Sequence, residues 1–160
     1  MITLVTGLKN TGKSSYLYNW FCREPVGFGV LSIKRFEGEV HSGYDLLFLP
    51  IGKKVNLCTR MNESYTGCKE DLVRGNYIFD QSAFDQAYQF IQENLYYKKE
   101  PIWLDEIGIL EIDGKGFWPI IKMIQPMDIE LRLGVRLSCV YEFTRMIENN
   151  NFHIIYSTSG

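Results

Sequence analysis

The hydrophobic and polar positions of this chain form two patterns that point to different structures. Short apolar runs at 2–6 and 101–105 are typical of buried strands. The first run leads through a glycine-containing loop into a helix-compatible stretch at 13–23. Between the two runs, residues 26–79 contain many glycines and several short alternating segments. That texture predicts an antiparallel β meander.

The pattern changes again at residue 80. Over 80–97 the apolar residues recur every three to four positions, which predicts an amphipathic helix. Ser82 and Asp85 resemble a capping box at the start of this helix. The remainder of the chain alternates between the two kinds of element. We expect a helix over 116–124, strands within 129–140, a helix over 141–149 and a last strand over 153–157.

These elements together describe an α/β protein. A chain of 160 residues matches the size of a single domain and can build its own hydrophobic core. The order of the elements favours a mostly parallel sheet flanked by helices, with the meander at 26–79 inserted after the first helix. We therefore assign residues 1–160 to one domain.

Composition excludes several classes of function. The net charge is −2, so the basic excess of nucleic-acid-binding proteins is lacking, and we expect no nucleic-acid partner. No apolar run approaches the roughly 20 residues of a transmembrane helix, so we expect no membrane association. The first apolar run is too short for a signal-peptide core. We expect a cytoplasmic protein with reduced thiols at Cys22, Cys58, Cys68 and Cys139.

Residues 7–14 fit the Walker A pattern G-x-x-x-x-G-K-[ST] at every fixed position. Gly7 and Gly12 let the backbone turn its N–H groups toward one anion at a helix N-terminus. Lys13 supplies positive charge to the β and γ phosphates, and Ser14 offers a hydroxyl ligand for Mg²⁺. The alternative is a plain glycine turn that leaves Lys13 in solvent. The predicted nucleotide-binding residues are Gly7, Leu8, Lys9, Asn10, Thr11, Gly12, Lys13, Ser14 and Ser15.

An acidic pair, Asp105 and Glu106, closes the second apolar run and has the form of a Walker B strand. Asp105 at the end of a strand is placed to hold Mg²⁺ through water, so Ser14 and Asp105 are the predicted metal residues. Glu106, one position later, is placed to orient or deprotonate an attacking water and is, with Lys13, a predicted catalytic residue. Glu111 is a weaker candidate for the same cleft. The alternative is a solvated strand end without function.

Three sequence blocks resemble the THEP-type (cancer-related) family of small P-loop nucleoside triphosphatases. Residues 104–111 and Phe117 resemble that family's D-E-I-G-K-M-E-L signature. Residues 41–49 look like its R-x-G-F-D-L-V-x-L block, and residues 75–80 with Phe84 look like its G-x-Y-x-V-D…F-E segment. The resemblance runs from the Walker A loop to about residue 121.

The resemblance implies a RecA-like P-loop fold and slow, Mg²⁺-dependent hydrolysis of ATP, GTP, CTP and UTP to the diphosphate and phosphate. By position, Gly12, Lys13 and Ser14 carry over as phosphate and metal binders. Asp105 carries over as the metal carboxylate and Glu106 as the catalytic acid. Broad base specificity is expected.

The arginine that would stabilise transition-state charge stays open. Arg35 stands one position before the arginine of the family pattern, which turns a strand side chain to the opposite face unless a bulge absorbs the offset. His41 and Ile109 also replace basic residues of the family pattern. Arg132 and Arg136 lie in or beside a predicted late strand and are further candidates for contact with the γ-phosphate.

Two other functions remain as alternatives to hydrolysis. A small-molecule P-loop kinase would move the γ-phosphoryl group to an acceptor, but the chain has no arginine-rich lid segment. A nucleotide-binding switch, or a module that binds a partner, would bind nucleotide tightly with negligible turnover. The sequence identifies no protein partner, and we expect a monomer.

Overall fold

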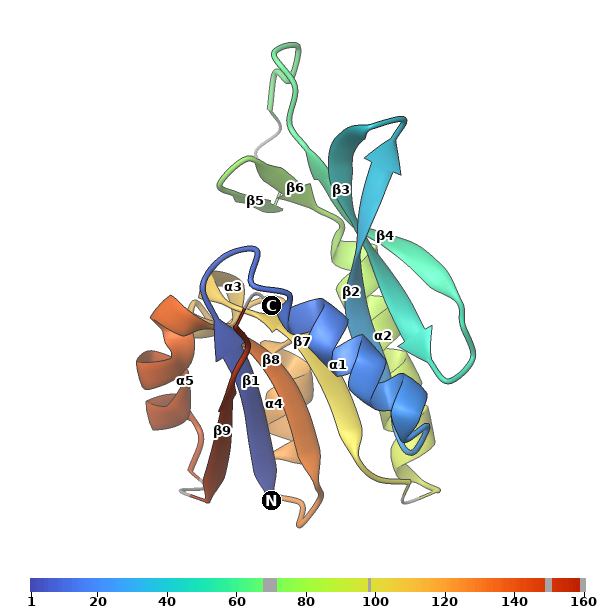
Figure 1. Cartoon of the computed structure of the whole chain (residues 1–160), viewed down its shortest axis with the longest axis vertical. Coiled ribbons are helices and arrows are strands. Elements are labelled where there is room, and N and C mark those ends of the chain that lie inside the picture. The colour runs from blue at the N-terminus through green and yellow to red at the C-terminus, as the bar shows by residue number, and fades with distance from the viewer. Residues whose placement is uncertain (68–71, 98, 149–150, 159–160) are drawn as a thin grey trace.

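A computed structural model of the chain describes residues 1–67, 72–97, 99–148 and 151–158 (Figure 1). Its strands are β1 (Ile2–Gly7), β2 (Phe28–Glu37), β3 (Val40–Leu49), β4 (Lys54–Arg60), β5 (Leu72–Arg74), β6 (Tyr77–Phe79), β7 (Ile102–Ile107), β8 (Leu131–Arg136) and β9 (Phe152–Tyr156). Its helices are α1 (Lys13–Arg23), α2 (Gln81–Leu95), α3 (Ile109–Ile112), α4 (Trp118–Ile124) and α5 (Val140–Met146), with a 3₁₀ turn at Leu137–Cys139.

The described strands form one mixed sheet in the order β5-β6-β4-β3-β2-β7-β8-β1-β9. The pairs β2–β7, β7–β8, β8–β1 and β1–β9 are parallel. The pairs β2–β3, β3–β4, β4–β6 and β6–β5 are antiparallel. The α/β class is confirmed, whereas the expectation of a mostly parallel sheet is wrong, because half of these pairings are antiparallel.

Strand β2 is the reason why the two kinds of pairing share one sheet. Its first residues, from Phe28 to Val30, pair in parallel with β7, while the strand from Gly29 to Glu37 pairs antiparallel with β3. A turn of only two residues joins β2 to β3, and so short a connection permits only antiparallel pairing. The antiparallel meander therefore continues the parallel part of the same sheet, and β2 is the strand that the two parts share.

Adjacent residues of the central strands point to opposite faces, and each face has its own helices. In β7, Trp103 packs with Leu17 and Phe21 of α1 on one face. Ile102 and Leu104 pack on the other face with the larger core, to which α2, α4 and α5 contribute. Figure 1 shows α1 in front of the sheet and α2 and α4 behind it.

The helix predicted over 13–23 is confirmed by α1, but three details of the predicted elements are wrong. The side chain that caps α2 is that of Asp80, which accepts from the N–H of Ser82, so the capping box was misplaced. The segment 129–140 holds one strand followed by a 3₁₀ turn and the start of α5. Strand β5 was not predicted. Cys68 lies outside the described residues, as does the predicted helix end at position 149.

No helix in the described part of the chain is long and apolar enough to cross a membrane.

Candidate nucleotide-binding and catalytic site

The Walker A loop joins the carboxyl end of β1 to the first turn of α1. The loop turns through two residues with positive φ, Asn10 at 64° and Gly12 at 79°. Because a left-handed residue ends the loop directly before the helix, the free N–H groups of the first turn of α1 face the loop's interior. The geometry is that of an anion-binding nest at a helix N-terminus.

A second chain segment anchors this loop. The Thr11 hydroxyl donates to the Leu8 carbonyl at 2.8 Å and lies 3.1 Å from the hydroxyl of Ser157, directly after β9. Ser157 in turn donates from its hydroxyl to the Thr6 carbonyl at 3.1 Å. A side chain at Gly7 would collide with both hydroxyls. The sequence carried no signal for Ser157, because β9 reaches the loop only through the sheet.

The amino group of Lys13 spans the loop and donates to the Leu8 carbonyl at 3.3 Å. The residue is half-buried and lines both of the cavities described below.

Asp105 and Glu106 reach the loop together because β7 is irregular at its end. The β7–β8 register shifts between Leu104 and Ile107, and Glu106 has a φ of 66°. In a regular strand these neighbours would point to opposite faces, but the bulge and the left-handed residue turn both carboxylates toward the Walker A side. Strain of this kind in a non-glycine residue is typical of functional sites.

The Asp105 carboxylate is buried, with 1% of the residue exposed. It accepts from the N–H of Glu106 at 2.8 Å and of Ser32 at 3.2 Å. Burial raises the pKa of Asp105, and the nearby Ser14 side chain opposes that rise. Gly134 of β8 lies directly against this carboxylate, where a Cβ atom would collide with it.

Glu106 is half-buried and faces charges of both signs. Burial, followed by the negative charge of Asp105, raises the pKa of Glu106 to about 7. The positive charges of Arg136 and Lys13 oppose that rise. A carboxyl group with a pKa near neutrality is suited to take a proton at physiological pH.

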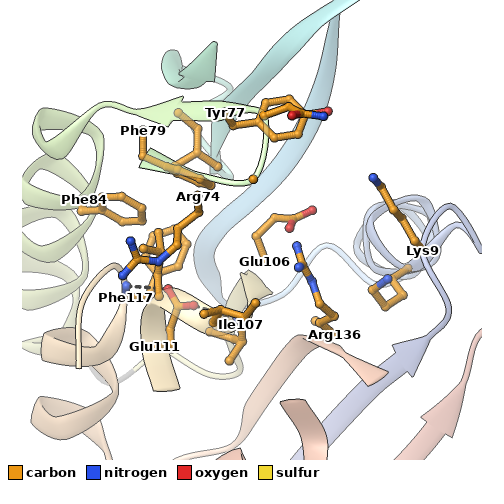
Figure 2. A pocket seen from close by; sticks show the side chains of 18 of the residues that line it. Lys9, Arg74, Tyr77, Phe79, Phe84, Glu106, Ile107, Glu111, Phe117 and Arg136 are labelled. Atoms are coloured by element: carbon orange, nitrogen blue, oxygen red, sulfur yellow. Dashed lines mark hydrogen bonds between the residues drawn. The ribbon is translucent and has the colours of Figure 1, made fainter. Parts of the chain in front are cut away.

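Among the three arginine candidates, the structure brings Arg136 to the site. It ends β8 and pairs in register with Gly7, so its guanidinium starts beside the Walker A loop. Figure 2 shows that guanidinium next to Glu106. Within the described part of the chain it has no hydrogen bond or ion pair of the kind that holds the other two arginines.

Arg35 lies on the hairpin instead. The strand pairing does shift between Arg35 and Phe36, but this bulge does not bring the Arg35 side chain to the Walker A loop. The guanidinium is 2.6 Å from Asp45, donates to Asn56 at 2.7 Å and donates to the Cys58 carbonyl at 3.1 Å.

Arg132 lies near the start of β8, in register with Thr3 and Trp103, whereas the Walker A loop follows the far end of β1. Its guanidinium lies 4.0 Å from the ring centre of Trp20 and is 2.9 Å from Glu130. Packing and ion pairing account for this side chain.

Glu111 is buried and holds the loop after β7. Its two carboxylate oxygens accept from the N–H of Gly108 at 2.7 Å and of Phe117 at 2.9 Å, the latter drawn in Figure 2. Burial raises the pKa of Glu111 to about 7. Because both oxygens are engaged with the backbone, its evident role is to shape the wall of the cleft.

Two cavities meet at the site. The larger, of about 630 Å³, runs from the start of α1, at Ser14 and Ser15, to Tyr18 and to Ser32 of β2. The smaller, of about 360 Å³, runs from the Walker A loop to β6 and to the loop after β7. Asn10, Lys13 and Glu106 line both, so these side chains mark their common boundary.

The residues present fit a divalent cation that arrives with a nucleotide. Among the described residues, no group of three or more His, Cys, Asp or Glu side chains is arranged to hold a metal ion by itself. Ser14 and Asp105 offer two oxygens, and the buried Ser32 hydroxyl beside them has no hydrogen-bond partner. Mg²⁺ keeps several waters and takes phosphate oxygens, and such a water would satisfy Ser32.

Comparison with known proteins shows a shared fold. No family model matches the chain, and no curated protein matches it in sequence. THEP1 from the hyperthermophile Aquifex aeolicus is similar in structure, with a TM-score of 0.72 and 20% identity over 99% of this chain and 90% of that one. A human cancer-related nucleoside triphosphatase is similar too, with a TM-score of 0.67 and 18% identity over 96% of this chain and 87% of that one.

Proposed function

We propose that this chain is a Mg²⁺-dependent nucleoside triphosphatase that hydrolyses NTPs to the diphosphate and phosphate, with broad base specificity. The observation that carries the proposal is the irregular end of β7, where Asp105 and the positive-φ residue Glu106 both face the Walker A loop. Of the two proteins with a similar fold, one is THEP1 and the other is a human cancer-related nucleoside triphosphatase. This similarity supports membership of the THEP-type family.

The triphosphate lies along the loop in a direction that the cavities suggest. Ser15 lines only the larger cavity, whereas Lys13 and Glu106 stand at its boundary. With the α-phosphate at Ser15, the γ-phosphate falls between Lys13 and Glu106. The nucleoside then extends into the larger cavity, toward Tyr18.

Ser14 and Asp105 would hold the Mg²⁺, directly and through water respectively. Bound there, the cation would supply positive charge to the β and γ phosphate oxygens. The Ser14 side chain lies near enough to Asp105 to act on its pKa, which supports a shared cation.

Glu106 takes a proton from the attacking water. The guanidinium of Arg136 stabilises the negative charge that develops on the γ-phosphoryl oxygens. The raised pKa of Glu106 supports the first role, and the free guanidinium of Arg136 beside it supports the second. An arginine that neutralises this charge contributes roughly 10³–10⁵ in rate.

The test is phosphate release from ATP, GTP, CTP and UTP, with Mg²⁺ or with EDTA. Lys13→Ala should lose both binding and release. Glu106→Gln and Arg136→Gln should bind Mg²⁺–NTP with little change in affinity, while their release rates fall by about 10² or more. Arg60→Gln, at an exposed arginine that lines neither cavity, is the matched control. Tight Mg²⁺-dependent binding by the wild type without any release would refute hydrolysis and favour a nucleotide-binding switch.

A further inference from the structure

The smaller cavity lies beyond the γ-phosphate end of the proposed NTP site. It shares Asn10, Lys13 and Glu106 with the larger cavity, but Ser15 and Tyr18 do not line it. A nucleotide whose α-phosphate lies at Ser15 therefore leaves this cavity empty. Any molecule in it would approach the γ-phosphorus from the Glu106 side.

One wall of this cavity is aromatic. The rings of Phe84 and Phe117 meet edge to face with centres 4.9 Å apart, and Phe79 stacks on Phe84 at 6.1 Å. Figure 2 shows these three side chains on the side opposite to Lys9 and Arg136. Phe84 and Phe117 are almost wholly buried and therefore hold the half-buried Phe79 in place, and Phe79 presents the more exposed ring to a planar, apolar group.

Among the charged residues that line this cavity, cations outnumber carboxylates. Lys9, Lys13, Arg74 and Arg136 reach the cavity, against the carboxylates of Glu106 and Glu111. Both oxygens of Glu111 are bonded to backbone N–H groups. Arg74 pairs with Asp113 at 2.8 Å, but its side chain stays 33% exposed and still borders the cavity. A ligand with a negative charge is therefore favoured over a neutral or cationic one.

We propose that the smaller cavity is an acceptor site for a small aromatic acid that carries a hydroxyl group, and that this hydroxyl replaces water as the acceptor of the γ-phosphoryl group. The inference rests on the proposed NTP site. The aromatic ring lies against Phe79, Phe84 and Phe117, the anionic group faces Arg74, and the hydroxyl faces Glu106.

The transfer balances without a further reactant. The hydroxyl oxygen forms a bond to the γ-phosphorus, and the bond from that phosphorus to the β–γ bridging oxygen breaks. The bridging oxygen keeps the electron pair, and the nucleoside diphosphate leaves. The hydroxyl proton passes to the Glu106 carboxylate and then to solvent.

The site is tested first by binding. The probe is 1-anilinonaphthalene-8-sulfonate, an aromatic anion whose fluorescence rises in apolar cavities, titrated into the protein with and without saturating Mg²⁺–adenylyl imidodiphosphate. We expect binding in both conditions. Phe79→Ala and Arg74→Gln should each weaken it about tenfold, which corresponds to about 1.4 kcal/mol. Arg74→Gln leaves the core untouched if Phe79→Ala disturbs folding.

The controls are Tyr96→Ala, at a tyrosine that is 86% exposed, and Arg60→Gln, neither of which lines the cavity. Both should bind the probe as the wild type does. Displacement of the probe by the nucleotide analogue, with no effect of the two cavity variants, would overturn the proposal and make this cavity the nucleoside end of the NTP site.

The acceptor role is tested with 4-hydroxyphenylacetate and γ-labelled ATP. The compound should displace the fluorescent probe, and label should then move from inorganic phosphate to the phenolic phosphate ester, less so in Arg74→Gln. Failure to displace the probe, or displacement without labelled ester, overturns the proposal. Phosphate release without acceptor, measured in parallel, tests NTP hydrolysis separately, so each can fail alone.

Discussion

Replacing Glu106 with glutamine should make the protein more stable at alkaline pH. The same substitution should abolish NTP hydrolysis. The folded protein raises the pKa of Glu106 from 4.5 to about 7 by burial and by the charge of Asp105. Between these two values the folded state holds a proton that the unfolded state has released. Stability therefore falls as the pH rises from about 4.5 to 7 and then levels off.

The size of the effect follows from the two pKa values. The raised pKa of Glu106 lowers the free energy of unfolding by about 3 kcal/mol at pH 8 but by only about 1 kcal/mol at pH 5. Glutamine has nearly the same shape and keeps the left-handed backbone, so Glu106→Gln removes the charge alone. The gain in unfolding free energy should be about 2 kcal/mol larger at pH 8 than at pH 5.

The assay is urea unfolding of both proteins at pH 5 and pH 8, without Mg²⁺ or nucleotide. The exposed Glu63, changed to glutamine, is the matched control and should show no such difference between the two pH values. An equal effect of Glu106→Gln at both pH values, or a loss of stability at pH 8, would refute a raised pKa of this carboxyl group in the folded protein.

Three further measurements bear on the same site. In the wild type, kcat/KM for Mg²⁺–ATP should fall about tenfold per pH unit below pH 7, because the free enzyme must hold Glu106 ionised; a flat profile from pH 5 to 8 would exclude it as the base. Gly134→Ala should lower Mg²⁺–NTP affinity and cost about 1–3 kcal/mol of stability, because the new Cβ collides with the Asp105 carboxylate; calorimetric titration and urea unfolding measure the two. Arg132→Ala should lower the free energy of unfolding by about 2 kcal/mol, because the stacking on Trp20 and the ion pair with Glu130 are lost, and should leave nucleotide affinity unchanged. A loss of nucleotide affinity at unchanged stability would instead place Arg132 at the phosphates.

The sequence determined the parts of this protein whose signals are local. The Walker A loop needs a left-handed backbone conformation at position 12. Glycine adopts that conformation readily, so the residue type alone indicates the turn. Helix α1 follows directly from the same loop, and its extent agrees with the stretch predicted at about 13–23. Asp105 and Glu106 were found because an acidic pair ends an apolar run.

Other features depend on which strands become neighbours. Arg35, Arg132 and Arg136 were all candidates in the sequence, and only the parallel register of β8 with β1 places Arg136 beside Gly7. Ser157 supports the loop because β9 pairs with β1 from the other side. Pairing between strands far apart in sequence leaves no local trace.

The mixed sheet and the position of Glu106 were likewise decided by tertiary structure. Strand β2 reads as part of a meander, yet its first residues pair in parallel with β7, because a strand in the middle of a sheet bonds to both sides. The alternation rule alone would separate Asp105 from Glu106. The bulge that turns both side chains to the same side forms where β7 pairs with β8. The sequence therefore determined which residue types are present at the site, and the tertiary structure decided that they point in a common direction.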